Sequence, residues 1–73
     1  MNEDYFFDRK KLIEHAKKVL EKKEIKGSHI AEQIDMNRKQ LYDYRNGIRN
    51  IENARLETLL KFERYYHKIK HNL

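Results

Sequence analysis

Apolar residues early in the chain recur at the spacing of an amphipathic helix. They repeat every three or four residues between about residue 8 and residue 24, at Leu12, Ile13, Ala16, Val19 and Leu20. Charged side chains occupy most of the positions between them. Because an α-helix turns once in about 3.6 residues, this spacing puts the apolar side chains on one face. The pattern predicts a first helix, with Asp8 as its N-cap.

Little in the sequence interrupts helix formation after this run. Proline is absent, and the only glycines are Gly27 and Gly47. Gly27 and Ser28 follow the first predicted helix, and either is able to cap a short second helix that runs through Ile34. We expect one all-α domain over residues 1–73, a compact bundle of four to five helices that ends in a long C-terminal helix.

Two asparagines mark the starts of the remaining helices. Asn37 is a candidate N-cap of a third helix that reaches Arg45 or Asn46. Gly47 follows as a C-cap residue, because glycine adopts a positive φ without the steric cost of a Cβ atom. Asn53 is the candidate cap of the last helix, which we expect to run to about residue 70.

Residues 30–47, IAEQIDMNRKQLYDYRNG, have apolar side chains where two short helices that meet at a sharp turn need them. A small residue, Ala31, allows the second helix to cross the third steeply. The apolar lining of the pair consists of Ile30, Ile34, Met36, Leu41 and Tyr44. This arrangement predicts a helix-turn-helix over residues 28–46, and the alternative is a third helix with an ordinary solvated face.

The third predicted helix keeps side chains that have hydrogen-bonding ends and no evident role in a core. They are Arg38, Lys39, Gln40, Tyr42 and Asp43. Such a set suits a surface that reads base edges in the major groove, since Arg and Lys donate to guanine and Gln pairs with adenine. Lys39 and Gln40 could equally well form hydrogen bonds with a DNA phosphate group. Tyr42 has two open roles, contact with a thymine methyl group and cover for a helix end.

Asp43 is unusual in a surface meant for DNA, because a carboxylate repels phosphates. It is tolerable where it accepts a hydrogen bond from cytosine N4 or orients a neighbouring basic side chain. We favour the orienting role, since Lys39 lies one helical turn before it.

The stretch over residues 30–47 resembles the phage repressor and Cro type of helix-turn-helix, also called the xenobiotic-response-element family. A looser likeness extends through RLETLLKF, residues 55–62. The resemblance implies that Arg38, Lys39 and Asp43 face the major groove, flanked by Gln40 and Tyr42. It also implies contacts with the DNA backbone from Ser28, Asn37, Arg45, Asn46, Arg49 and Asn50.

The chain departs from the family pattern at three places. Asp35 stands in the turn where the family usually has Gly, and Asp tolerates the left-handed conformation better than most residues. Gly27 stands where the family often has a phosphate-anchoring Gln, so that contact is not expected. The loop after Gly47 is longer than usual.

The last predicted helix carries a heptad pattern that suggests a second role. Its apolar residues are spaced three, four, three and four apart, at Leu59, Phe62, Tyr66, Ile69 and Leu73. With Leu56 and Leu60 facing the domain core, this seam predicts a homodimer. The alternative is that Tyr5, Phe6 and Phe7 fold back and cover the seam within one chain.

Composition and charge agree with a small nucleic-acid-binding domain. The 73 residues carry a formal net charge of +5 and no Cys, so disulfides and thiolate metal sites are excluded. The apolar runs are too short to cross a bilayer, and we expect a cytoplasmic protein of a bacterial or phage-infected cell. Among the histidines, His67 and His71 are four residues apart, which we interpret as a solvated pair, and His15 and His29 are isolated.

No residues form a recognisable catalytic, metal or cofactor site, and we do not expect an enzyme. The sequence predicts a sequence-specific double-stranded DNA-binding regulator, a repressor of the phage or mobile-element type that acts as a homodimer on a palindromic operator. The alternative is a protein-interaction module of the same fold, such as an antitoxin or a repressor antagonist.

Overall fold

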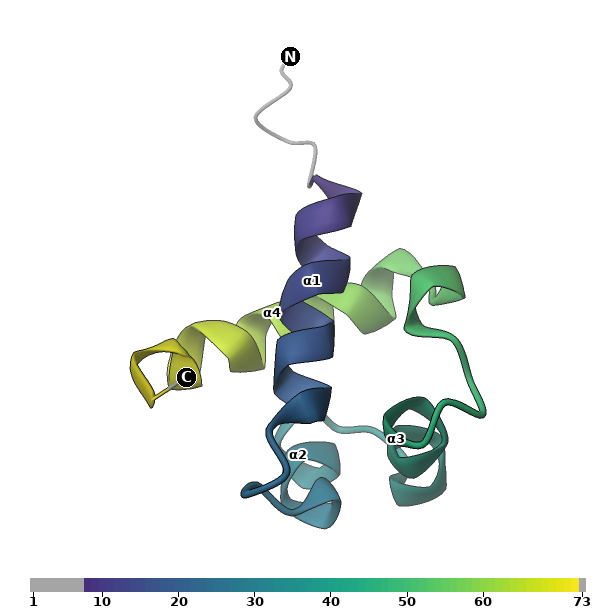
Figure 1. Cartoon of the computed structure of the whole chain (residues 1–73), viewed down its shortest axis with the longest axis vertical. Helices are drawn as coiled ribbons and strands as arrows, with labels where there is room; N and C mark the ends of the chain where they lie inside the picture. The colour runs from purple at the N-terminus through teal and green to yellow at the C-terminus, as the bar shows by residue number, and fades with distance from the viewer. Residues whose placement is uncertain (1–7, 73) are drawn as a thin grey trace.

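A computed structural model describes residues 8–72, and the regular secondary structure in this part of the chain is all helical, without a strand (Figure 1). In chain order the elements are α1 (Arg9–Glu21), α2 (Gly27–Gln33), α3 (Arg38–Arg45), the 3-10 turn η2 (Ile51–Asn53), α4 (Leu56–Ile69) and the 3-10 turn η3 (Lys70–Asn72). The predicted all-α class and the long C-terminal helix are confirmed. None of the described helices has both the length and the apolar character needed to span a membrane.

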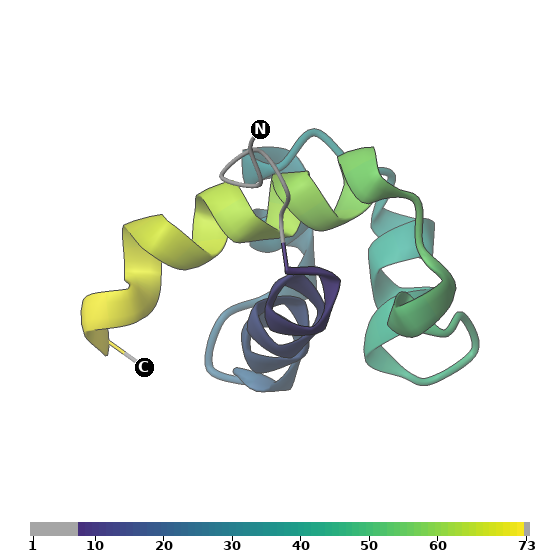
Figure 2. The same cartoon turned by 90° about the horizontal axis from the view of Figure 1, so that it is seen from above.

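The helices form two pairs. α1 packs across α4, and α2 packs against α3 at the C-terminal end of α1 (Figure 1). Viewed from above, α4 passes along one side of α1, and its C-terminal half extends past the other helices (Figure 2). The short α2–α3 pair therefore sits at one end of a cross made by the two long helices.

The core lies where the two pairs meet. Its buried side chains are Leu12, Ala16, Val19, Leu20, Ile30, Ala31, Ile34, Leu41, Ile51, Ala54, Leu59, Phe62 and Tyr65. Phe62 is the largest of those that are fully buried, and its ring meets Tyr44 edge-on at 6.3 Å between centroids. Burial of each large apolar side chain contributes about 1.5–3 kcal/mol, which makes this cluster the main source of stability. The buried position of Ala31 agrees with the predicted close approach of α2 to α3.

Two of the predicted N-caps are confirmed. The Asp8 carboxylate accepts a hydrogen bond from the Lys10 backbone N–H at 3.0 Å, at the start of α1. The Asn37 side-chain oxygen accepts from the backbone N–H groups of Lys39 at 2.8 Å and Gln40 at 3.3 Å. Each cap pairs backbone donors in the first turn that have no partner within the helix.

The other two predicted caps are wrong. α2 begins at Gly27 after Lys26 in the cap position, and no side chain caps it, so Ser28 already lies inside the first turn. Asn53 ends η2 instead of starting α4, which begins at Leu56 with Arg55 in the cap position. The reason is that η2 brings Ile51 and Ala54 into the core before α4 starts.

α2 and α3 end in the same way. Asp35 has a φ of 58° and Gly47 a φ of 81°, the left-handed conformation expected at both positions. Beyond each of them the chain turns back: the Met36 N–H donates to the Ala31 carbonyl at 2.8 Å, and the Ile48 N–H donates to the Asp43 carbonyl at 2.8 Å. This is the Schellman ending, which satisfies helix carbonyls that lack an internal partner.

The predicted dimer seam on α4 does not match the structure. Leu59 and Phe62 are fully buried within the chain, whereas Leu56, expected in the core, is 48% exposed. α1 crosses α4 at this face and covers it, which fixes the rotation of α4 about its axis. Tyr66, Ile69 and Leu60 are half-buried and pack against the same core. The positions of Leu73, Tyr5, Phe6 and Phe7 lie outside the described residues.

Candidate nucleic-acid interface

The first turn of α3 directs its long side chains to solvent. Arg38 and Lys39 are exposed, the Lys39 side chain at 82%, while Gln40 is half-buried and Leu41 is fully buried. Leu41 anchors the helix in the core, and the Asn37 cap fixes its first turn. The structure thus brings the first two predicted base-reading residues onto one exposed surface at the start of α3.

Asp43 connects this surface to the loop that follows α3. Its carboxylate lies 3.3 Å from Lys39 Nζ and 3.9 Å from Arg49 Nε, and its side chain is only 14% exposed. The contact with Lys39 is the one predicted from the one-turn spacing. The contact with Arg49 depends on the Schellman ending, because the Asp43 carbonyl also accepts the Arg49 N–H at 3.0 Å.

These groups enclose a shallow hollow at the start of α3. It is lined by Asn37, Lys39, Gln40, Asp43 and Arg49. Two cations flank one carboxylate, so the hollow keeps a positive excess. The Lys39 and Arg49 side chains are themselves largely exposed, so both cations are accessible to a competing anion.

Arg45, predicted to contact the DNA backbone, has a structural role instead. Its guanidinium donates from Nε to the Leu20 carbonyl at 2.9 Å and from Nη2 to the Lys22 carbonyl at 3.2 Å. These carbonyls lie at the C-terminal end of α1, where a cation is favourable. Arg45 therefore ties α3 to α1, and we do not assign it to the interface.

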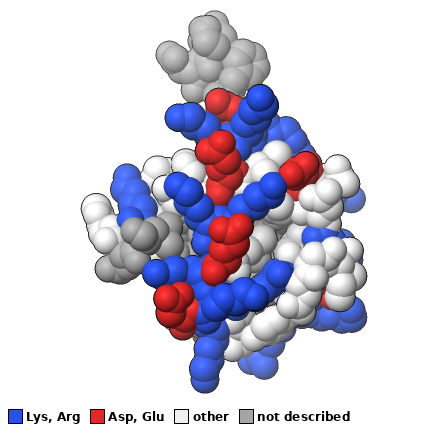
Figure 3. All heavy atoms as spheres, in the orientation of Figure 1, with Lys and Arg blue, Asp and Glu red and all other residues white. Residues whose placement is uncertain are grey.

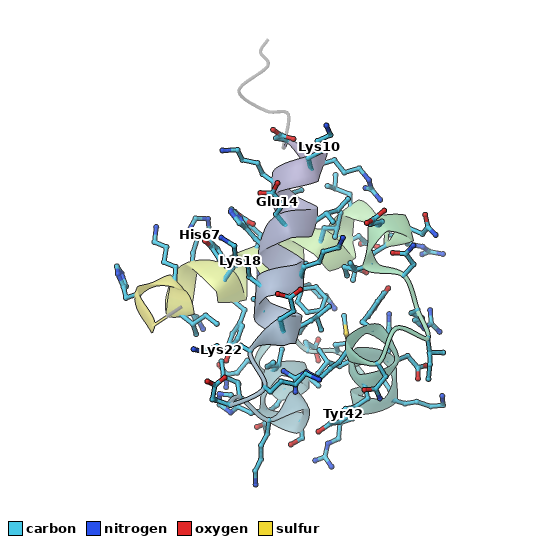
Figure 4. All side chains as sticks on the ribbon, viewed as in Figure 1. Lys10, Glu14, Lys18, Lys22, Tyr42 and His67 are labelled. Atoms are coloured by element: carbon cyan, nitrogen blue, oxygen red, sulfur yellow. The ribbon has the colours of Figure 1, made fainter. Side chains whose placement is uncertain are left out.

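Tyr42 covers the start of α2, one of its two open roles. A Cβ atom built on Gly27 would lie 2.6 Å from Tyr42 Cζ, so the ring rests directly on the glycine. The ring remains 39% exposed, at the α2–α3 end of the molecule (Figure 4). Gly27, which departs from the family pattern, thereby gains a role that the sequence did not reveal.

The remaining residues predicted to contact the DNA backbone differ in how free their side chains are to bind a partner. Asn37 and Asn50 each use the side-chain oxygen to cap a helix or turn, which leaves only their NH₂ groups for another partner. Asn46 is exposed directly after α3, and Ser28 is half-buried in the first turn of α2. Arg49 is the one charged member of the set that lies beside the hollow.

A second polar cluster joins α1 to α4 and corrects the reading of two histidines. Glu63 Oε1 lies 2.7 Å from His15 Nδ1, and Glu63 Oε2 lies 2.8 Å from His67 Nε2. His15 also stacks on Tyr66 with 3.9 Å between ring centroids. His15 is therefore not isolated, and His67 bonds to Glu63. Within residues 8–72 no group of three His, Cys, Asp or Glu side chains is arranged to hold a metal ion.

The outer face of α1 carries charges of both signs. Lys and Arg side chains alternate with Asp and Glu along this helix (Figure 3). Lys10, Glu14, Lys18 and Lys22 follow one another down that face (Figure 4). It is the ordinary pattern of a solvated helix rather than a surface of one sign.

Comparison with known proteins yields no match to a family model, a curated protein or a solved structure. The resemblance to phage repressors therefore stays a prediction from the sequence.

Proposed function

We propose that this protein is a transcriptional regulator that binds double-stranded DNA sequence-specifically, with α2 and α3 acting as a helix-turn-helix. One observation carries the proposal: α3 is capped at both ends and presents Arg38 and Lys39 to solvent beside a hollow with a positive excess. A short rigid helix with exposed Arg and Lys in its first turn fits the major groove, where such side chains read base edges. The formal net charge of +5 suits a phosphate-rich partner.

Each residue of the surface has a distinct role in this proposal. Arg38 and Lys39 donate to base edges, and Gln40 contacts adenine or phosphate. Asp43 orients Lys39 and Arg49, the latter reaching the phosphate backbone. Tyr42 shapes the edge of the surface from its position over Gly27.

The proposal includes a homodimer that represses by occupying a palindromic operator. A single recognition helix reads few base pairs, and two copies related by a two-fold axis read half-sites about one DNA turn apart. Because Leu59 and Phe62 are buried within each chain, the contact must use another surface. The large apolar side chains exposed elsewhere include Ile48, at 73%, and Leu56.

Selection of bound sequences from random duplex DNA tests the proposal directly. We expect a consensus with inverted half-sites, and we expect Arg38→Ala or Lys39→Ala to weaken binding to it by about 1–3 kcal/mol. These variants should lose preference at one position, because each removes a base contact. Lys10→Ala is the matched control, since Lys10 lies at the far end of the molecule from Tyr42 (Figure 4).

Two results would contradict this assignment. If a gel-shift assay detects no binding to any duplex even at low salt, the protein does not bind DNA, and a protein-interaction module becomes the better hypothesis. If Arg38→Ala weakens all sequences equally, Arg38 contacts phosphate and specificity arises elsewhere.

A further inference from the structure

Three cations form a row along α4. Lys61, Arg64 and Lys68 are spaced three and four residues apart, so they lie on one side of the helix. All three line a single hollow between α4 and the α2–α3 turn. The other lining residues are Gln33, Ile34, Asp35 and Tyr65.

The row begins beside the proposed interface. Lys61 Nζ donates to the Asp35 backbone carbonyl at 3.0 Å. Asp35 lies two residues before Asn37, the N-cap of α3. From this point the row follows α4 toward its C-terminal half, which extends past the other helices on the side opposite α3 (Figure 2). The row therefore starts next to the α2–α3 turn and leads away from α3 along α4.

The row differs from α1 in its balance of charge. Asp35 is the single carboxylate among the residues that line the hollow. Glu63, on the same helix, is bound by His15 and His67. Within residues 8–72, neither Arg64 nor Lys68 takes part in any of the ion pairs. Cations without acidic partners suit a polyanion better than the mixed charges of α1 do.

We propose that Lys61, Arg64 and Lys68 bind successive phosphates of the duplex whose major groove α3 reads. This inference rests on the proposed function, and it extends the contact from α3 along α4. The row spans about 10 Å from Lys61 to Lys68, whereas the first and third of three successive phosphates on one strand are about 7 Å apart along the duplex axis, a difference that flexible Lys and Arg side chains can accommodate. The row supplies affinity and sets the orientation of the domain on the duplex, and it carries no base specificity.

Salt dependence measures this contribution separately from base reading. In the full chain, Lys61→Gln, Arg64→Gln and Lys68→Gln together should make the slope of log K against log salt shallower by about 2–3, at ~0.9 per phosphate. The matched control is Lys10→Gln, Lys18→Gln and Lys22→Gln, which removes the same charge from the outer face of α1 (Figure 4). We expect the control to change the slope by less than 1, with both variants as helical as the parent by circular dichroism.

The outcomes separate the two proposals. Equal changes of slope in both triple variants would overturn the phosphate row, because net charge alone would then explain them. If Arg38→Ala weakens binding while the α4 triple leaves the slope unchanged, the row fails and the DNA-binding function stands. If the parent chain binds no duplex, both fail. If the α4 triple variant lost affinity only for single-stranded nucleic acid and not for the duplex, the proposed phosphate row would also be overturned, and the partner would be a single strand.

Discussion

The two helix pairs are stabilised in different ways. α1 and α4 contribute seven of the buried side chains of the core, among them Leu12, Val19, Leu59 and Phe62. α3 buries only Leu41, and α2 buries Gly27, Ile30 and Ala31. The α2–α3 pair compensates through its ends, with a side-chain cap at Asn37 and left-handed residues at Asp35 and Gly47. The α1–α4 pair is stabilised mainly by side-chain packing, whereas the α2–α3 pair depends more on the hydrogen bonds and backbone conformation at its helix ends.

The largest expected effect tests the packing of the long pair. Phe62→Ala should destabilise the domain by about 3–5 kcal/mol, because it empties a fully buried site. Leu56→Ala, on the same helix but 48% exposed, is the control and should cost less than about 1 kcal/mol. Chemical denaturation measures both. Similar losses in the two variants would mean that α4 is rotated from the orientation described above.

The next effect tests the cap of the short pair. Asn37→Ala should cost about 1 kcal/mol, because two first-turn N–H groups of α3 lose their acceptor. Ser28→Ala should stay within about 0.5 kcal/mol, since Ser28 does not cap α2. Thermal unfolding distinguishes them, and a larger loss at Ser28 than at Asn37 would reverse the assignment of caps.

A contrast of similar size separates the two helix ends. Gly47→Ala should destabilise by about 1 kcal/mol through backbone strain alone, because open space surrounds the position where a Cβ would lie. Asp35→Gly should gain up to about 0.5 kcal/mol by relieving the same strain. Denaturant midpoints compare the pair. A stabilising Gly47→Ala would be inconsistent with the positive φ.

The smallest effect concerns the pair formed by Lys17 and Glu52, which are 2.7 Å apart on the surface between α1 and η2. The hydrogen bond with Lys17, followed by its charge, lowers the pKa of Glu52, and the corresponding interactions raise the pKa of Lys17. For Glu52, any stabilisation is present above the ordinary Glu pKa of 4.5 and declines as pH falls through the lowered pKa. For Lys17, it is present below the ordinary Lys pKa of 10.5 and declines as pH rises through the raised pKa.

Because both groups are exposed, Glu52→Gln should barely change the unfolding midpoint at pH 7. The small difference from the parent should shrink as the pH falls below 4.5. A midpoint shift at pH 7 as large as that of Asn37→Ala would show that this pair is more strongly coupled than its exposure allows.

The parts of the fold that could be predicted from the sequence depend on neighbouring residues. Asp8, Asn37, Asp35 and Gly47 act within a few residues of themselves, so a local pattern was enough. The rotation of α4 could not be predicted in this way. Leu56 with Leu60 and Leu59 with Phe62 have equally good helical spacing, and only the crossing of α1 decides between them.

The site shows the same division. The Lys39–Asp43 pair follows from a one-turn spacing and was predicted, whereas Arg45 bonds to a carbonyl 25 residues away. His15 and Glu63 are 48 residues apart, and the contact of Tyr42 with Gly27 requires α2 and α3 to be packed. Recognition of DNA stays a prediction, since it is a property of a complex.

The capping at both ends of α3 affects which substitutions this helix can accept. The hydrogen bonds that begin and end this helix are made by Asn37 and by the backbone around Gly47, and its core anchor is Leu41. The exposed positions at Arg38 and Lys39 contribute side chains to neither. Mutations at these outward positions of α3 can therefore change which side chains are presented to solvent while the free energy of unfolding stays almost constant.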